Sequence, residues 1–123
     1  MFKINDDQSI YLTRGDVAVI GTSADNDGVE HTFAAGDVVR FRVLEKNDCG
    51  RVLLQKDFEV TEECTAVEIR LEKEDTKIGE LINKPKDYWY EIELNPDTEP
   101  YTIVGYDEDG PKILRLFPEG DDA

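Results

Sequence analysis

The sequence predicts a single all-β domain, and three observations lead to this prediction. Apolar and polar side chains alternate with a period of two along most of the chain, which is the pattern of half-buried strands. Turn signals such as Asp27-Gly28 and Asp109-Gly110-Pro111 recur about every 8 to 12 residues, as in sandwiches and barrels. The 123 residues, 39% hydrophobic and 35% charged, supply apolar material for one core only.

The first two predicted strands are short. Ile10 and Leu12 alternate in the first, and a turn at residues 14–16 leads into the second. The alternating residues of the second strand are Val17, Val19 and Gly21. We expect both strands to be short or to lie at sheet edges.

Three longer strands follow, over residues 37–44, 51–60 and 65–72. Each has one apolar face and one polar face, which predicts burial on one side only. Their predicted inward residues are Val39, Phe41 and Val43, then Val52, Leu54, Phe58 and Val60, and then Val67, Ile69 and Leu71. Arg40 and Arg42 lie on the opposite face of the first of these strands.

Residues 73–82 are the only candidate for helical structure. Ile78, Leu81 and Ile82 approach helical spacing, but Gly79 costs about 1 kcal/mol of helix propensity relative to alanine. The sequence therefore predicts at most one short helical turn near residues 73–82.

The next strand, over residues 88–94, holds the main concentration of aromatic side chains. Alternation predicts one face formed by Tyr88, Tyr90, Ile92 and Leu94, and an opposite face formed by Trp89, Glu91 and Glu93. Tyr88, Trp89 and Tyr90 are the candidate residues for contact with a protein partner or a glycan, because aromatic side chains contribute much of the binding energy at interfaces. The alternative is that these rings fill the core beside Phe41 and Phe58.

The last two predicted strands cover residues 101–106 and 112–117. Asp107-Glu108-Asp109-Gly110 separates them, and glycine supplies the positive φ that a tight turn needs. We therefore predict a β-hairpin here. Residues 1–118 form the single domain, and residues 119–123 form an acidic flexible tail.

The net charge is −15, from 29 acidic and 14 basic residues. This excess argues against binding to nucleic acid, which needs lysine and arginine at the phosphates, and against binding to an anionic membrane surface. Mimicry of DNA would require ordered rows of carboxylates, whereas many of the acids fall in turns. Solubility and reduced self-association are the simpler explanation of the charge.

Targeting signals and disulfides are not expected. No apolar run approaches the roughly 20 residues that span a bilayer, and the first residues do not resemble a signal peptide, so we expect synthesis in the cytoplasm. Cys49 and Cys64 flank a predicted strand whose ends would lie about 30 Å apart, beyond the reach of a disulfide. The sequence predicts two free thiols.

No residue pattern indicates catalysis, a metal site or a cofactor. His31 is the only histidine, so any site that needs histidine would have to include it. The loop at residues 25–28 fails the calcium-loop pattern, and the turn at residues 107–110 fails it as well, which leaves only weak calcium binding open. A pair of carboxylates acting as acid and base stays possible in a chain this acidic, although no carboxylate stands in an apolar context.

The order of these elements resembles a family of small Firmicutes phage and prophage structural proteins, and in particular the N-terminal domain of phage baseplate upper proteins. The resemblance covers almost the whole chain and is carried by packing and turn residues. They are Leu12-Thr13-Arg14-Gly15-Asp16, Ala35-Gly36-Asp37-Val38-Val39-Arg40-Phe41, Asp87-Tyr88-Trp89-Tyr90-Glu91-Ile92 and the closing segment to Phe117-Pro118-Glu119-Gly120. Baseplate upper proteins continue into a receptor-binding region, whereas this sequence ends at Ala123.

The resemblance implies an Ig-like antiparallel β-sandwich of about seven to nine short strands and a non-enzymatic, architectural role. The expected partners are other phage structural proteins, with self-association into a homo-oligomer as a further expectation, and the expected location is the bacterial cytoplasm and then the virion. No cofactor is expected. The alternative functions are a carbohydrate-binding module that uses exposed aromatic side chains and, third, a hydrolytic enzyme.

Overall fold

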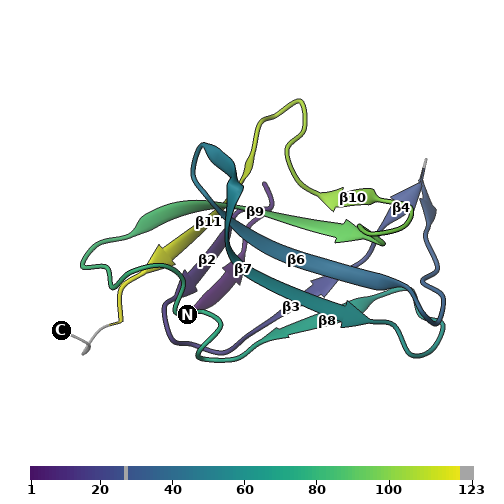
Figure 1. The fold of residues 1–123 in the computed structure, drawn as a ribbon, viewed down its shortest axis with the longest axis horizontal. Coiled ribbons are helices and arrows are strands. Elements are labelled where there is room, and N and C mark those ends of the chain that lie inside the picture. Colours follow the sequence, from purple (N-terminus) through teal and green to yellow (C-terminus); the bar gives the residue numbers. More distant parts are fainter. Residues whose placement is uncertain (27, 120–123) are drawn as a thin grey trace.

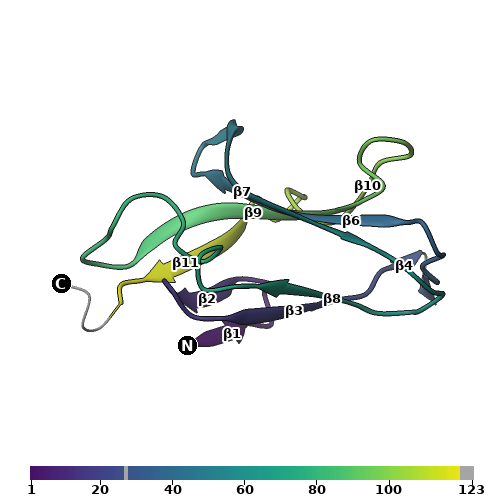
Figure 2. The ribbon, with the colours of Figure 1, turned by 60° about the horizontal axis from the view of Figure 1, so that its bottom comes forward.

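The computed structural model describes residues 1–26 and 28–119, and of Asn26 and Cys49 it describes the backbone only. Within these ranges the protein consists of strands and loops and contains no helix. The strands form two layers that enclose one apolar core (Figures 1 and 2). The predicted all-β sandwich is therefore confirmed.

Within the described residues, one large sheet of seven strands forms the first layer. In order across the sheet its strands are β1 (Phe2–Ile4), β2 (Ile10–Thr13), β11 (Lys112–Phe117), β9 (Lys86–Leu94), β6 (Val38–Glu45) and β7 (Asp48–Glu59), and β10 (Tyr101–Val104) also pairs with β9. All these pairs are antiparallel except β2 with β11, which is parallel. The expectation of a wholly antiparallel sheet is wrong at this pair, because the chain turns back after β1 and then runs in the same direction as its last strand.

The second layer is smaller. It contains β3 (Ala18–Thr22) paired with β8 (Val67–Leu71), and a short separate pair of β4 (Asp25–Asn26) with β5 (Val29–Glu30) lies beyond the end of β3. Figure 2 shows β1 and β2 at the level of β3 and β8, so the large sheet curls over at this side and closes part of the sandwich. The structure has more strands than the seven to nine predicted, because very short strands pair at the ends of the sandwich.

The core is formed mainly by alternate residues of the long strands. Tyr88, Phe33 and Phe41 are the largest of its fully buried side chains. The predicted inward faces of β6, β8 and β9 are confirmed. In β3 the buried residues are Ala18 and Ile20 rather than the valines at 17 and 19, because both faces of this segment are apolar and a shift of one residue exchanges them.

The segment around residues 73–82 contains a hydrogen-bonded turn. The N–H groups of Asp75 and Thr76 donate to the carbonyl oxygen of Glu72, at 2.9 and 3.3 Å. The buried hydroxyl of Thr76 accepts from the N–H of Gly15 at 3.0 Å and donates to the carbonyl oxygen of Asp16 at 2.8 Å. The prediction of at most one short turn is confirmed, and Thr76 ties this turn to the connection between β2 and β3.

The predicted hairpin of the last two strands is wrong. Both β10 and β11 pair with β9, and they lie end to end along the same edge of it. Only the turn itself is as predicted, since Asp107 and Gly110 form an isolated bridge. The loop between Val104 and Lys112 therefore projects from an interrupted strand (Figure 1).

The end of the chain differs from the predicted tail at Glu119. Its carboxylate accepts a hydrogen bond from Arg14 at 3.1 Å, and the side chains of both residues are largely buried. Residues 120–123 of the predicted flexible tail lie outside the described residues. Cys64 is a free thiol, as predicted, and the side chain of Cys49 lies outside the described part of the structure.

Candidate functional site

The structure separates the three aromatic residues that the sequence proposed for partner contact. Tyr88 and Tyr90 point into the core, with 0% and 4% of their surface exposed, so their candidacy for partner or glycan contact is wrong. The hydroxyl of Tyr90 donates to the carbonyl oxygen of Gln8, and burial raises the pKa of this tyrosine to about 12. Trp89 points to the opposite face of β9, which we call the outer face of the large sheet.

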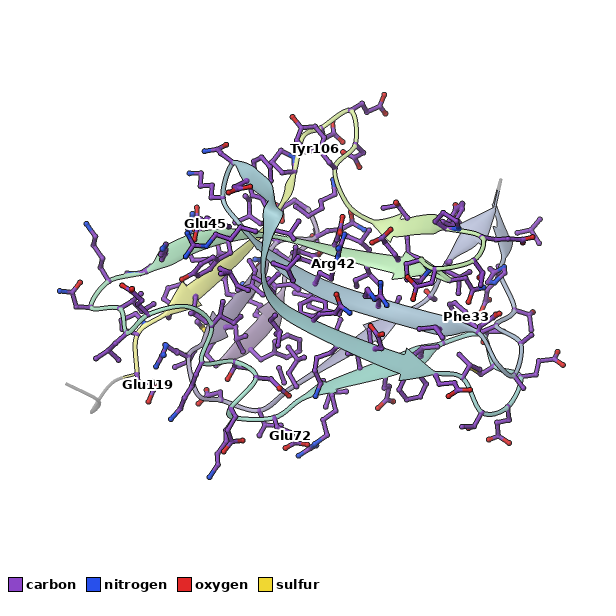
Figure 3. The ribbon with its side chains drawn as sticks, viewed as in Figure 1. Phe33, Arg42, Glu45, Glu72, Tyr106 and Glu119 are labelled. Carbon is purple, nitrogen blue, oxygen red and sulfur yellow. The ribbon has the colours of Figure 1, made fainter. Side chains whose placement is uncertain are left out.

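Trp89 forms an edge-to-face pair with Tyr106 on this outer face. The ring centroids lie 5.9 Å apart at an interplanar angle of 74°, a favourable geometry for two aromatic rings. Tyr106 comes from the loop between β10 and β11 and is 69% exposed (Figure 3). On the neighbouring strand β6, Leu44 lies opposite Trp89 and is buried. Trp89 is therefore supported on one side by Leu44 and approached on another by an exposed tyrosine.

Two arginines on β6 lie beside this aromatic pair, on the same outer face. Arg40 donates to Asp57 on β7 at 2.8 Å and to Asp97 at 3.0 Å, so it joins β7 to the turn after β9. Arg42, which is labelled in Figure 3, donates to Glu91 and, at 3.2 Å, to Glu93, both on β9. The hydrogen bonds from Arg40 lower the pKa of Asp57.

A second group of aromatic and arginine side chains lies further across the outer face, on β2 and β11. The rings of Tyr11 and Phe117 meet edge to face at 5.5 Å, and the guanidinium of Arg115 lies 5.5 Å from the centre of the Tyr11 ring. Arg115 also donates to Asp87 on β9 at 2.7 Å, and this bond lowers the pKa of the Asp87 carboxyl. The outer face thus presents aromatic rings and paired arginines over several strands.

Glu91 and Glu93 best match the pair of acid and base carboxylates that the sequence analysis kept as an alternative. Burial, followed by the charge of Glu91, raises the pKa of Glu93. Both carboxylates bind the same arginine, Arg42, and lie on the open face of a sheet between β6 and β10. This arrangement provides fixed charges for recognition. Both carboxylates are bound by one guanidinium nitrogen of Arg42, whereas the buried Nε of Arg42 has no hydrogen-bond partner among the described residues.

The described ranges were searched for clusters of metal ligands and for membrane-spanning helices. In residues 1–26 and 28–119, no three His, Cys, Asp or Glu side chains are placed to hold a metal ion together. Nowhere in the same ranges is there a helix with the length and apolar character that crossing a bilayer requires.

The sequence identified part of this site. Alternation had already placed Arg40, Arg42 and Trp89 opposite the predicted core residues of their strands. The sequence could therefore predict that all three side chains point away from the core. Tyr106 was missed, because its position beside Trp89 depends on how an irregular loop folds back, and no periodic signal describes that. Comparison with protein-family models, with curated proteins and with solved structures finds no match for this chain.

Proposed function

We propose that this chain is a non-enzymatic phage or prophage structural protein, of the baseplate or tail adaptor type, that binds other structural proteins through the outer face of its large sheet. The Trp89 and Tyr106 pair between the paired arginines is the observation that carries the proposal. Tryptophan, tyrosine and arginine are the residues most enriched at the energetic centres of protein interfaces. The phage assignment itself is supported by the resemblance of the sequence.

We also propose that the sandwich is Ig-like. The order β11, β9, β6, β7 in the large sheet follows the order G, F, C, C′ of variable-type immunoglobulin sheets, and the pairing of β3 with β8 follows that of strands B and E. In immunoglobulin variable domains the sheet containing strands G, F and C is also a common surface for association. This correspondence supports the choice of the outer face as the interface.

The proposal is tested by asking whether the chain assembles into particles. Particles from a prophage-induced culture of the native host are purified on a density gradient and analysed by mass spectrometry. We expect the wild-type chain at stoichiometric levels with tail proteins. Its absence from particles, with abundant free protein in the lysate, overturns the proposal.

Substitutions then test which face is used. Trp89→Ala and Tyr106→Ala are expected to reduce incorporation about tenfold or more, because truncating a central aromatic residue costs about 2 kcal/mol of binding energy or more. Tyr106 is exposed in a loop, so its substitution leaves the core intact. Val19→Ala, on the exposed face of the small sheet, is the matched control and is expected to incorporate normally. Normal incorporation of both aromatic variants contradicts the use of this face.

A carbohydrate-binding module is the second candidate, and the exposure of Tyr106 beside Trp89 is the observation that favours it. A sugar ring stacked on either side chain would change the emission of Trp89, the only tryptophan of the chain. Titration with a panel of cell-wall glycans, followed by tryptophan fluorescence, separates the two functions. A saturable shift that Tyr106→Ala removes would establish glycan binding, and a constant emission would leave protein contact as the function.

A further inference from the structure

The large sheet has an open position beside β10. Both β10 and β11 lie along one edge of β9, but only β11 has another strand on its far side, and β2 begins there with Ile10 opposite Leu114. The residues before Ile10 do not continue along β10, because Gln8 has a φ of 72° and its N–H donates to Asn5 in the turn back to β1. Within the described residues β9 is the only strand that pairs with β10.

The direction of the backbone groups shows what this edge offers. The N–H of Asn95 donates to the carbonyl oxygen of Val38 on β6. Backbone groups of successive strand residues point to opposite sides, so the N–H and C=O of Leu94 point toward Tyr101 on β10. The backbone N–H and C=O of Tyr101 point back to β9. Those of the next residue, Thr102, point to the open edge. Thr102 therefore presents an N–H and a carbonyl for pairing with one more strand.

A groove runs beside this open edge. It has a volume of about 530 Å³ and lies between β10 and the pair of β4 and β5, since residues of all three strands line it. Tyr101 reaches across one end, where its hydroxyl donates to the carbonyl oxygen of Asp25 at 3.4 Å. Ile103 and Val104 supply the apolar side of the groove, and Gln8 closes the end nearest β2.

Most of the charges along the edge are negative. Asp25 and Glu30 line the groove, and none of its lining residues is basic. Gln8 also lines a second hollow of about 470 Å³ at the start of β11, so the two hollows follow the same edge. The carboxylates of the second hollow are Asp6, Asp7, Asp107 and Asp109. Its single basic group, Lys112, is already paired with Asp107 at 2.8 Å.

We propose that the open edge of β10 accepts an extended, basic segment of a partner protein, which adds to the large sheet in line with β2. Backbone pairing at Thr102 provides part of the affinity. Lysine or arginine side chains of the partner neutralise Asp25 and Glu30 in the groove and the carboxylates of the second hollow. This site is separate from the outer face, and the inference does not depend on the phage assignment.

A second copy of this chain fits the edge less well than a basic segment does. The chain carries a net charge of −15, so an approaching copy brings further negative charge to an edge that is already acidic. The strands of this chain carry no run of basic residues to offset that repulsion. The charge of the groove thus selects a partner of opposite sign.

The test uses the full chain and a synthetic peptide of eight residues in which lysine and valine alternate. Binding is followed by amide NMR, and we expect the peptide to shift the resonances of Tyr101, Thr102 and Gln8 and to slow hydrogen exchange at the Thr102 N–H. A peptide with glutamate in place of lysine is expected not to bind. Lack of saturable binding of the lysine peptide up to about 1 mM, or equal binding of the glutamate peptide, overturns the proposal.

Two variants test the charge and the backbone separately. Asp25→Lys with Glu30→Lys is expected to weaken binding about tenfold or more. The control, Glu68→Lys with Glu80→Lys, makes the same change in net charge at exposed positions of β8 and of the segment that follows it, and is expected to bind almost normally. Thr102→Pro removes the outward N–H without changing charge or the ladder to β9, and is expected to weaken binding of the lysine peptide, followed by the resonances of Tyr101 and Gln8. Equal affinity in the charge pair and its control, or unchanged binding by Thr102→Pro, contradicts the proposal.

These results are independent of the proposed function. If Trp89→Ala loses particle incorporation and Thr102→Pro binds the lysine peptide normally, the outer face is the interface and the open edge is not a docking site. If the chain is absent from particles but the peptide binds as described, the open edge of β10 is a docking site and the phage assignment is wrong.

Discussion

Tyr88 and Gly79 show how one residue constrains another in this core. The Tyr88 side chain is fully buried, and its hydroxyl has no hydrogen-bond partner among the described residues. A Cβ at Gly79 would lie 2.8 Å from that hydroxyl, and Gly79 has a φ of +65°, which other residues rarely adopt. Gly79 is therefore required for its backbone conformation and for the space that the Tyr88 hydroxyl occupies.

Tyr88→Phe is expected to stabilise the protein. The substitution removes a buried hydroxyl that gains no hydrogen bond and keeps the ring that fills the core, so the free energy of unfolding should rise by about 1 kcal/mol. Urea unfolding followed by circular dichroism measures the change. Tyr90→Phe is the control, because the Tyr90 hydroxyl is bonded to Gln8 and its loss should destabilise. A loss of stability in Tyr88→Phe would show that the hydroxyl has a partner.

Gly79→Ala is expected to lower the free energy of unfolding by roughly 1–3 kcal/mol, from the strained φ and from the contact with Tyr88. The loss should be smaller in the Tyr88→Phe background, where the hydroxyl is gone. Gly110→Ala is the matched control, since Gly110 also has a positive φ, +97°, but open space around its Cβ position. If Gly79→Ala lowers the free energy of unfolding equally in both backgrounds, contact with the Tyr88 hydroxyl does not contribute to the loss. Both comparisons use the same urea unfolding measurement.

At the scale of elements, side-chain ion pairs join strands that also share a backbone ladder. Arg115 on β11 binds Asp87 on β9, and the two residues are direct cross-strand partners. The pKa of Asp87 is lowered by this bond, so the folded state holds the charged form more strongly than the unfolded state. The pair therefore contributes stability above the ordinary pKa of an aspartate, and loses it as the pH falls through the lowered pKa.

Asp87→Asn is expected to cost about 1 kcal/mol at pH 7. The difference from wild type should shrink as the pH falls below the ordinary aspartate pKa of 3.8 and through the lowered pKa of Asp87. The measurement is the free energy of unfolding in urea as a function of pH. Glu68→Gln, at an exposed position on β8, is the control and should change little across the range. A cost for Asp87→Asn that persists at the lowest pH would mean that packing, rather than charge, explains it.

Sequence alternation predicted the inward faces of β6, β8 and β9 correctly and the pairing of the strands poorly. It also failed for the face of β3 and for Val52 and Phe58 of β7, which were expected inside and are 41% and 38% exposed. Arg42 and Phe41 were placed on opposite faces of one strand correctly, because the period of two is a local property of the backbone. The partner of each strand is decided by contacts far apart in sequence. For this reason the Asp-Gly turn at residues 107–110 was recognised, while the strands around it were wrongly joined to each other instead of to β9.

The interrupted strand leads to an expectation about the loop between β10 and β11. Val104 lies opposite Ile92 and Lys112 lies opposite Tyr90, so one residue is enough to join them along β9. Replacing residues 105–111 by one threonine should keep the β-sheet circular dichroism spectrum and a cooperative unfolding transition. The emission of Trp89 should shift to longer wavelength, because Tyr106 no longer approaches it. A variant that fails to fold would show that the loop stabilises the sheet.

At the scale of the whole molecule, the excess of carboxylates acts against the compact state. The net charge of −15 is spread over a chain of 123 residues, and folding brings these charges closer together. The ion pairs on the outer face offset this repulsion locally. The remaining repulsion is long-range and is therefore sensitive to ionic strength.

Added salt is expected to stabilise this protein. The melting temperature at pH 7 should rise between about 10 mM and about 200 mM sodium chloride, as screening weakens the repulsion between carboxylates. Differential scanning calorimetry measures the shift. The Glu68→Lys with Glu80→Lys variant, which is less negative, should show a smaller rise. A melting temperature that falls with salt would mean that the surface ion pairs outweigh the repulsion.

The parallel pair of β2 and β11 has a mechanical consequence. Thr13 donates to Met1 and Arg14 donates to Phe117, so the two ends of the described chain meet at the same end of β2. Tension applied between Met1 and Phe117 first peels β1 from β2, one hydrogen bond at a time. The force then acts along β2 and β11 in opposite directions and loads their shared hydrogen bonds in shear, so that these bonds must break together. Separating β1 from β2 therefore requires a low force, and separating β2 from β11 requires a much higher one.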